Sequence, residues 1–236
     1  GPGGSAGDEN IALPRGKRAN AACKLPSRLQ KRAGTDERDT PPAQKQQIAA
    51  VCERIIQNGD SIFLDSSTTA NYIAEKLTNY RLTVLTNSIQ IINTLASFSG
   101  ISLIMVGGNF DKKSQSFYGT RALEFVRSYH VDKAFFSCRS INYKSGVMDS
   151  NEKTSDIRRM IIDQSDRAYL CVDSSKFGAN SFVSICNFDA LTGLITDHIP
   201  SEERRTFLSK SGLSTYAYDE LDTAAPLASP AEEQQA

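Results

Sequence analysis

The chain has 236 residues, 39% of them hydrophobic, and its 27 basic residues balance its 27 acidic ones, so the net charge is zero. This length and apolar content allow a complete hydrophobic core in one α/β domain with an appended segment. The charge balance excludes an overall electrostatic attraction to nucleic acid. Five scattered cysteines without a CxxC spacing fit neither a disulfide framework nor a zinc site. The sequence has no signal-peptide pattern and no apolar run long enough to span a bilayer, which predicts a cytoplasmic protein without membrane contact.

Residues 1–40 differ in composition from the rest of the chain. The first five residues resemble a cloning remnant, and basic residues dominate between Arg15 and Arg32. Such a segment cannot bury enough apolar surface to offset its ordering entropy, which predicts a linker or arm. It is either a solvated tether or a segment that touches DNA phosphates. Residues 223–236, rich in Ala, Pro, Glu and Gln, predict a disordered tail, so the folded domain is expected at residues 41–222.

Regular patterns begin at Pro41. A first helix is predicted by helical spacing of the apolar residues between Ile48 and Ile56, and it is expected to end at Asn58-Gly59. Strands are then predicted at residues 62–64, 82–85, 102–106, 134–136, 169–172, 191–195 and 214–218. Helices are predicted around residues 70–77, 91–98, 122–129 and 157–161 and after residue 201. This alternation predicts a mostly parallel sheet with helices on both faces.

Residues 61–69 are the stretch on which the functional argument depends. An apolar strand there runs into the hydroxyl residues 66–69, which stand at the predicted start of the next helix. Unpaired backbone amides and the positive end of the helix dipole make such a helix start a candidate anion site. The simpler alternative is that Asp65 or Ser66 only caps the helix. The stretch by itself leaves both interpretations open.

In a parallel sheet ligands bind at the carboxyl ends of the strands, so the residues that follow each strand matter most. Small, polar or glycine residues follow five predicted strands, at residues 65–69, 86–88, 107–109, 137–140 and 173–178. Glycine lets a backbone approach a ligand, hydroxyls and amides pair with sugar hydroxyls, and Lys176 or Arg139 offers charge to a phosphate. Each feature alone is more simply a turn, a solvated lysine or a helix cap. Together they favour a site for a small polyhydroxylated anion.

A series of segments in this order resembles the effector-sensing domain of DeoR-type bacterial transcriptional regulators, from about Lys45 to Tyr218. The segments are DSSTT at 65–69, TNS at 86–88, GG at 107–108, DKAFF at 132–136, Glu152 followed by IRRMI at 157–161, VDSSKFG at 172–178 and LITD at 194–197. The resemblance implies a fold similar to ribose-5-phosphate isomerases and CoA transferases, and a phosphorylated sugar as effector. The winged-helix head that normally precedes this domain is not recognised in the sequence. We therefore expect a fragment that binds operator DNA only through a head missing from this chain.

The resemblance also implies the site residues. For the phosphate they are Ser66, Ser67, Thr68, Thr69 and Lys176; for the walls, Thr86, Asn87, Gly107 and Gly108; and for the sugar hydroxyls, Asp65, Arg139 and Glu152. No catalytic residue, metal or cofactor is implied, and a homo-oligomer is expected because family members associate through this domain.

Two positions depart from the family pattern, since Ser67 and Ser140 stand where the family has glycine. The added Cβ requires either a negative φ or some backbone strain, which leaves room for an effector other than the family's commoner ones. Arg139, beside Ser140, is either a specificity residue or the partner of Asp132 or Asp149.

An isomerase-like enzyme is the alternative, with Glu152 moving a proton and Lys176 holding the phosphate. Against it, the aspartate-rich segment and the glycine-rich loop of ribose-5-phosphate isomerases are missing. A purely structural interaction domain would not need the five polar strand ends.

Overall fold

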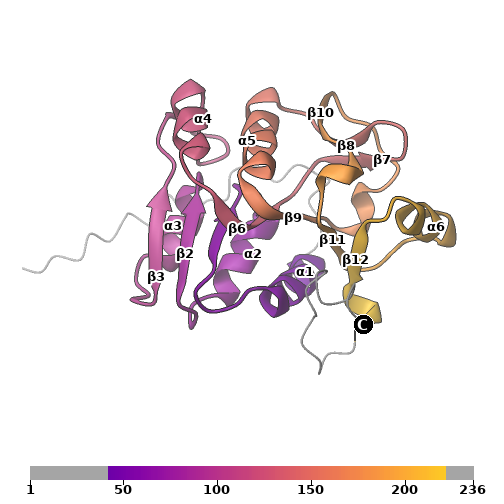
Figure 1. Cartoon of the computed structure of the whole chain (residues 1–236), viewed down its shortest axis with the longest axis horizontal. Coiled ribbons are helices and arrows are strands. Elements are labelled where there is room, and N and C mark those ends of the chain that lie inside the picture. The colour runs from indigo at the N-terminus through magenta and orange to yellow at the C-terminus, as the bar shows by residue number, and fades with distance from the viewer. Residues whose placement is uncertain (1–41, 222–236) are drawn as a thin grey trace, which may run out of the picture. The chain divides into compact units, whose positions relative to one another are not determined.

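The computed structural model describes residues 42–221, so the predictions for residues 1–40 and 223–236 lie outside the described residues. The described part is built on a parallel sheet of seven strands in the order β12-β11-β9-β6-β1-β2-β3 (Figure 1). The strands are β1 (Ser61–Leu64), β2 (Leu82–Thr86), β3 (Ile101–Met105), β6 (Val131–Phe136), β9 (Ser165–Cys171), β11 (Gly193–Thr196) and β12 (Ser214–Ala217). The predicted α/β class with a mostly parallel sheet is confirmed.

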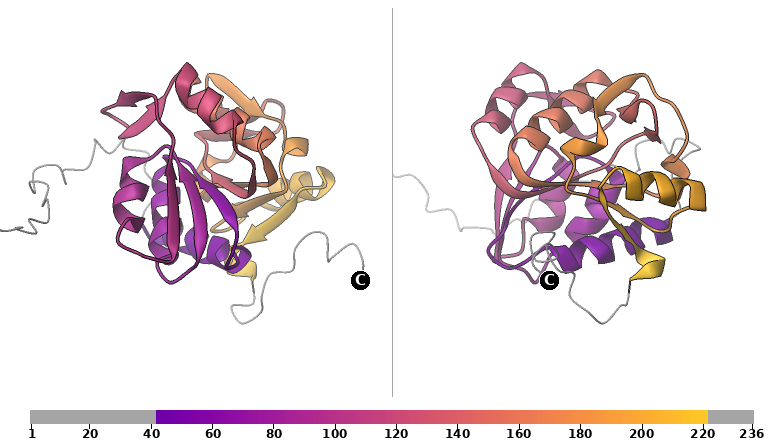
Figure 2. Two further views of the ribbon diagram at one scale, coloured as in Figure 1. Left: turned by 60° about the vertical axis from the view of Figure 1, so that its left-hand side comes forward. Right: turned by 45° about the vertical axis from the view of Figure 1, so that its right-hand side comes forward.

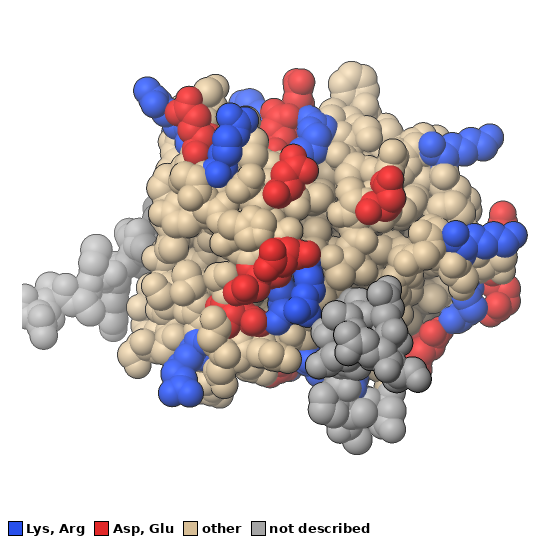
Figure 3. Space-filling model, in the orientation of Figure 1, with Lys and Arg blue, Asp and Glu red and all other residues tan. Residues whose placement is uncertain are grey.

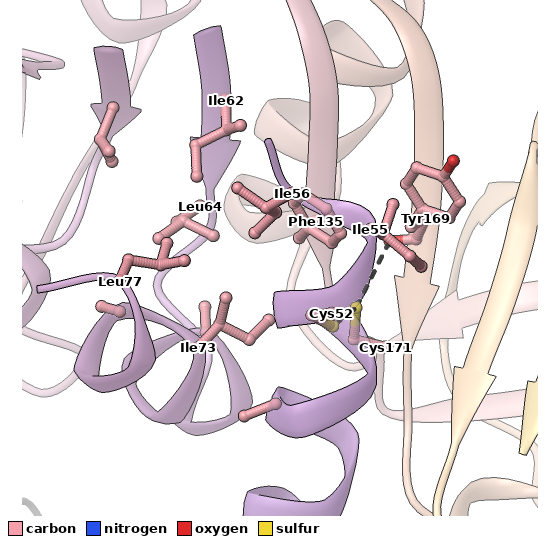
Figure 4. Close-up of a cluster of buried hydrophobic side chains, with 14 of the residues drawn as sticks. Cys52, Ile55, Ile56, Ile62, Leu64, Ile73, Leu77, Phe135, Tyr169 and Cys171 are labelled. Atoms are coloured by element: carbon pink, nitrogen blue, oxygen red, sulfur yellow. Dashed lines mark hydrogen bonds between the residues drawn. The ribbon is translucent and has the colours of Figure 1, made fainter. Parts of the chain in front are cut away.

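Helices cover both faces of this sheet (Figures 1 and 2). One face carries α1 (Pro42–Ile55), α2 (Thr68–Lys76) and α3 (Ile89–Leu95), and the other carries α4 (Thr120–Arg127) and α5 (Glu152–Asp163). Alternation along β1 explains the two layers, because Ile62 and Leu64 pack in the α1–α2 core whereas Phe63 packs in the α4–α5 core. Figure 4 shows Ile62 and Leu64 in the first of these cores. A sixth helix, α6 (Glu202–Lys210), packs Leu208 into a third cluster beside β9 and β11.

Two small antiparallel sheets were not predicted from the sequence. One is the hairpin of β4 (Asn109–Asp111) and β5 (Ser116–Tyr118), and the other joins β7 (Ser140–Asn142), β8 (Gly146–Asp149) and β10 (Val183–Cys186). Short 3₁₀ turns lie at η2 (Ser174–Lys176), η3 (Phe188–Ala190) and η4 (Tyr218–Glu220). Polar residues or glycine flank or interrupt the few apolar residues of these short strands, so no apolar run marks them in the sequence. Nothing longer than a turn was therefore expected in these segments.

Several predicted boundaries were wrong by a few residues. β6 begins at Val131 and β9 at Ser165, earlier than expected, because the second and third residues of both strands are charged and hide the strand in the hydrophobic pattern. Lys133 is 4% exposed and its Nζ lies 2.5 Å from Asp60 Oδ2, so this charge is paired inside the strand layer. The first helix, α1, ends at Ile55, three residues before the predicted stop at Asn58-Gly59. Among residues 42–221 no helix has the length and the apolar character that a membrane crossing needs.

The strand order places a topological switch point between β1 and β6. From β1 the chain adds β2 and β3 on one side, and it then adds β6, β9, β11 and β12 on the other. Leu64 at the end of β1 is in register with Phe135 of β6. In open α/β sheets the crevice beyond the carboxyl ends at such a reversal is the usual ligand site.

Candidate functional site

A cavity of about 250 Å³ lies at this switch point, beyond the carboxyl ends of β1, β6 and β9. Its lining residues are Lys45, Ser66, Ser67, Thr68, Thr69, Ser114, Tyr118, Ser137, Cys138, Arg139, Asp149, Ser150, Thr154, Arg158, Asp173 and Lys176. Four of these side chains are basic, two are acidic, and most of the others are serine or threonine. An excess of cations with many hydroxyls suits an anionic ligand that also carries hydroxyl groups.

The loop after β1 forms one wall of the cavity. Ser67 caps α2, because its Oγ accepts a hydrogen bond from the Ala70 amide at 3.1 Å. Its φ is −74°, so the Cβ that replaces the family's glycine is accommodated without strain. Within the described part of the chain, the amides of Thr68 and Thr69 have no hydrogen-bond acceptor. This helix start therefore combines a capping serine with amides that remain available to an anion.

Asp65 supports that loop from behind the cavity wall and is only 2% exposed. Its Oδ1 accepts hydrogen bonds from the Ser67 amide at 3.0 Å and from Ser67 Oγ at 2.5 Å. Its Oδ2 accepts one from the amide of Ser137, which follows β6, at 3.2 Å. Asp65 thus joins the ends of the two strands at the switch point, and it does not line the cavity.

Arg158 on α5 bridges Asp65 and Asp149. Its Nε and Nη2 lie 2.9 and 2.8 Å from Asp65 Oδ2, and its Nη1 pairs with Asp149 Oδ2 at the end of β8. Burial by itself lowers the pKa of this guanidinium, but the two carboxylates more than compensate and hold the pKa above its usual value. Arg158 is therefore a permanent positive charge that ties α5, β8 and the β1 loop together.

Lys176 is positioned by the 3₁₀ turn that follows β9. Asp173 caps this turn, since its Oδ1 accepts a hydrogen bond from the Ser175 amide at 3.0 Å. The ammonium of Lys176 lies 4.0 Å from Asp173 Oδ2, and its side chain is 14% exposed. The amide of Ser174 donates to Asp197 Oδ1 at 2.7 Å, which fixes the turn against β11. The turn thus holds a largely buried cation at the cavity.

Of the twelve residues predicted for the site, six line this cavity, namely Ser66, Ser67, Thr68, Thr69, Arg139 and Lys176. The predicted wall residues at the end of β2, Thr86 and Asn87, do not line it. Thr86 is fully buried and its Oγ accepts the Ser88 amide at 3.1 Å, while Asn87 donates its side-chain amide to the Phe117 carbonyl at 3.2 Å. Both residues therefore organise the start of α3 and the β4–β5 hairpin.

Three further predicted residues also lie outside the lining. Gly107 and Gly108 follow β3, the edge strand, which is separated from β1 by β2. Gly108 has φ +142° and a Cβ there would meet the Tyr118 carbonyl oxygen at 2.6 Å, so this glycine permits a close backbone approach. Glu152 is exposed at the first position of α5.

Residues that the sequence analysis missed come mainly from α1, α5 and the hairpin. Lys45 and Arg158 are charged positions on the buried faces of helices, at 7% and 5% exposure. Ser114 at the hairpin turn also lines the cavity. Asp111 shapes that turn by accepting the Ser114 amide at 3.0 Å, and this hydrogen bond lowers the pKa of the Asp111 carboxyl. Asp111, whose carboxylate can accept the backbone amides two and three residues further on, was the one available signal for the turn.

Ser140, the second position that departs from the family pattern, is also free of backbone strain. Among the described non-glycine residues only Gln115 has a positive φ.

The family model of the DeoR C terminal sensor domain matches residues 41–198 of this sequence. The chain belongs to this family.

Two relatives agree with this assignment. The uncharacterized HTH-type transcriptional regulator YulB of Bacillus subtilis is 39% identical over 154 residues, which make up 65% of this chain and 60% of that protein. The HTH-type transcriptional repressor GlcR of the same species is 31% identical over 174 residues, or 74% of this chain and 67% of that protein. The chain thus spans about two thirds or less of these relatives. Both are named as transcriptional regulators and neither as an enzyme, in agreement with the non-enzymatic role expected for this domain.

Among solved structures, eIF2B beta from Chaetomium thermophilum matches with a TM-score of 0.50 and 15% identity, over 72% of this chain and 52% of that one. This likeness concerns the fold alone. Ribose 5-phosphate isomerase A from Methanocaldococcus jannaschii matches with a TM-score of 0.42 and 15% identity, over 56% of this chain and 53% of that one.

Proposed function

We propose that this DeoR-family sensor domain binds a phosphorylated sugar or a related metabolite in the cavity, and that binding controls attachment of a regulator to DNA. The observation that carries the proposal is that unpaired amides at the start of α2 and a largely buried lysine line the same cavity at the topological switch point. Thr68 and Thr69 supply the amides, and Lys176 supplies the charge.

The phosphate end of the ligand belongs at the start of α2. Its amides and dipole favour negative charge, and the hydroxyls of Ser66 and Thr68 add donors. Ser66 Oγ lies 2.9 Å from the hydroxyl of Tyr118, so its orientation is set before a ligand arrives. Lys176 brings a full charge to the same cavity, and a hydrogen bond to a charged group is worth about 1.5–3 kcal/mol.

The polyol end of the ligand has its own set of partners. Ser114, Ser150 and Thr154 line the cavity with hydroxyls. Each of these hydroxyls can donate to or accept from a hydroxyl group of a ligand. The ligand is therefore expected to carry hydroxyl groups as well as a phosphate.

The isomerase alternative relied on a carboxylate at the substrate carbon. Glu152, the residue proposed for that step, is exposed and does not line the cavity. The carboxylate that does line it beside α5, Asp149, is engaged by Arg158 and by the amides of Ser150 and Asn151. Because the Asp149 carboxylate is already paired and Glu152 lies outside the cavity, the site favours a sensor over a proton-transfer enzyme.

Operator DNA and a second copy of the chain are the proposed macromolecular partners. On the face of the domain shown in Figure 3, basic and acidic side chains are interspersed and form no broad basic patch. The two relatives are named as HTH-type regulators, and this chain covers 60% and 67% of them, so we assign DNA binding to a separate head. We expect the sensor domain itself to associate into a homo-oligomer. Light scattering that reports a monomer at high concentration would contradict the second point, and tight sequence-specific DNA binding by this chain in physiological salt would contradict the first.

A thermal-shift screen tests the ligand assignment. Pentose and hexose phosphates are compared with the same sugars without phosphate, because a ligand at one hundred times its Kd adds about 2.7 kcal/mol to the stability of the folded state. That gain corresponds to a rise of roughly 5–10 °C in Tm for a domain of this size. The rise should shrink in Lys176→Met and persist in Lys76→Met, whose lysine is exposed on the last turn of α2. If no phosphorylated sugar raises Tm, the proposed function is wrong.

A further inference from the structure

Strand β3 forms one edge of the seven-stranded sheet, with β2 as its neighbour on the inner side (Figures 1 and 2). Its residues, Ile101–Met105, include no charged residue and no proline, although proteins usually protect an exposed edge strand with one or the other. Ser102 is exposed, and the three apolar residues that follow it, residues 103–105, are half-buried. The strand is therefore open to pairing with another strand.

The opposite edge of the sheet differs from β3. Its edge strand, β12, is followed directly by the 3₁₀ turn η4, and α1 and α6 both contact it. Tyr216 and Ala217 of β12 are buried. Of the two edges, β3 is thus the more accessible one.

The backbone groups of β3 point alternately towards β2 and away from it. The carbonyl of Gly100 accepts an amide of β2 at 3.2 Å, and the amide of Val106 donates to a carbonyl of β2 at 2.9 Å. Because bonding residues alternate along a parallel ladder, the even-numbered residues of β3 face β2. Leu103 and Met105 therefore direct their amides and carbonyls outwards. Within the described part of the chain, these outward groups have no hydrogen-bond partner.

Two copies of this edge are complementary when they run antiparallel about a two-fold axis at Ile104. Leu103 of one copy then lies opposite Met105 of the other, and each such pair exchanges two backbone hydrogen bonds. A two-fold axis at Leu103 would instead place Met105 opposite Ile101, whose amide already donates to the Phe98 carbonyl at 3.1 Å. The register centred on Ile104 is therefore the one that pairs every outward group of residues 103 and 105.

We propose that this chain dimerises through β3, with two copies paired antiparallel about Ile104 so that their sheets join into one. This inference rests on the homo-oligomer of the proposed function and names its interface. A stable interface buries about 1,200 Å² or more, which a single pair of short strands does not reach. The hairpin that follows β3 adds apolar surface, since Phe110 is 42% exposed and its ring lies 5.3 Å from that of Phe117. The cavity lies beyond β1, β6 and β9, so both copies keep it accessible.

Cysteine cross-linking tests the register. In Ile104→Cys the two new cysteines face each other with Cα atoms about 4.5 Å apart, within the range for a disulfide. Ser102→Cys is the matched control on the same strand, because its two copies are offset by four residues, or roughly 13 Å. Both variants are made with Cys23→Ser, since Cys23 lies outside the described residues. With copper phenanthroline as oxidant, Ile104→Cys should form a covalent dimer readily and Ser102→Cys should not.

Sedimentation velocity over a range of concentrations tests the interface itself. Met105→Lys places a charge at the centre of the strand pair and should raise the Kd of the dimer roughly tenfold or more. Phe182→Lys is the control, because Phe182 is an apolar residue that is 89% exposed and lies next to β10 rather than at this edge. It should leave the Kd unchanged.

The outcomes separate this inference from the rest of the proposed function. If the parent chain is a monomer at high concentration, the homo-oligomer and this interface both fail. If the parent dimerises but Met105→Lys dimerises equally well, or Ser102→Cys cross-links as fast as Ile104→Cys, the interface is wrong and the homo-oligomer stands. If circular dichroism shows that Met105→Lys does not fold, the cross-linking comparison decides alone.

Discussion

Removal of the Arg158 guanidinium is expected to destabilise the domain far more than removal of a charge at its surface. Arg158 is 5% exposed, and the carboxylates that it pairs, those of Asp65 and Asp149, are 2% and 8% exposed. In Arg158→Met the packing volume is largely kept, but two buried negative charges lose their partner. Breaking a buried pair in this way costs about 3–5 kcal/mol. Because small domains are stable by only about 5–15 kcal/mol, the variant should lose about a fifth or more of its stability.

Urea unfolding at pH 7 without ligand, followed by circular dichroism, measures this loss. Arg121→Met is the matched control, because the Arg121 side chain is 88% exposed and its pair with Glu124 should contribute about 0–1 kcal/mol. Adding Asp149→Asn to Arg158→Met should recover part of the lost stability, since one of the two buried carboxylates that lost the guanidinium is then removed.

The pH dependence of the variant has a definite sign. Loss of the guanidinium removes an attraction that favours the charged form of both carboxylates, so their folded-state pKa values rise relative to those in the parent. The folded variant then binds more protons than the folded parent at the same pH, so its deficit relative to the parent should shrink as pH falls from 7 towards 5. A loss below about 1 kcal/mol at pH 7, or a deficit that grows on acidification, would refute the role assigned to Arg158.

Three other predictions concern single positions. Gly108→Ala should lower the urea midpoint of unfolding strongly, because the new Cβ meets the Tyr118 carbonyl oxygen at 2.6 Å and φ is +142°. Gly107→Ala is the control and should be nearly neutral, because its Cβ has no atom within 4 Å. Equal midpoints for the two variants would show that the backbone shifts to accommodate the Cβ. Tyr118→Phe should weaken sugar-phosphate binding by about 0.5–1.5 kcal/mol through loss of the contact with Ser66, and unchanged affinity in calorimetry would exclude that contact as a positioning device. Burial raises the pKa of the Cys186 thiol to about 12, so alkylation at pH 8 should be on the order of a hundredfold slower than in urea-unfolded protein, and rapid labelling by mass spectrometry would contradict this environment.

Much of the fold follows from local patterns that the sequence displays openly. The run Ile62, Phe63, Leu64 is apolar on both sides, as a strand covered on both faces requires, and it does pack in two different cores. A hydroxyl residue caps α2, but it is Ser67, and not Asp65 or Ser66 as the capping interpretation had it. The capping and ligand interpretations of this loop are thus compatible, because one serine caps while the neighbouring amides of Thr68 and Thr69 stay open.

The site could be predicted only from the rule that ligands bind at the carboxyl ends of the strands in a parallel sheet. That rule applies equally to every strand, so it selected Lys176 after β9, which lines the cavity, together with Gly107 after β3, which does not. Which strand ends meet depends on the strand order, and the reversal between β1 and β6 is not visible in a chain-order pattern. Arg158 and Lys45 were missed for a different reason, since a charged residue on a helix is normally solvated and its burial depends on tertiary partners.

Calorimetric titration of the parent chain and of Lys176→Ala with the best sugar phosphate and its dephosphorylated form tests the central claim most directly. We expect removal of the phosphate to weaken binding to the parent by far more than binding to the variant. Lys176→Ala itself should cost about 1–3 kcal/mol in affinity for the phosphorylated form, and Thr68→Val a similar or smaller amount. Little change in Tm is expected without ligand, because Lys176 lies at the cavity rather than in a core. If the dephosphorylated sugar binds the parent equally well, or if both variants bind the sugar phosphate as the parent does, the cavity does not hold a phosphate.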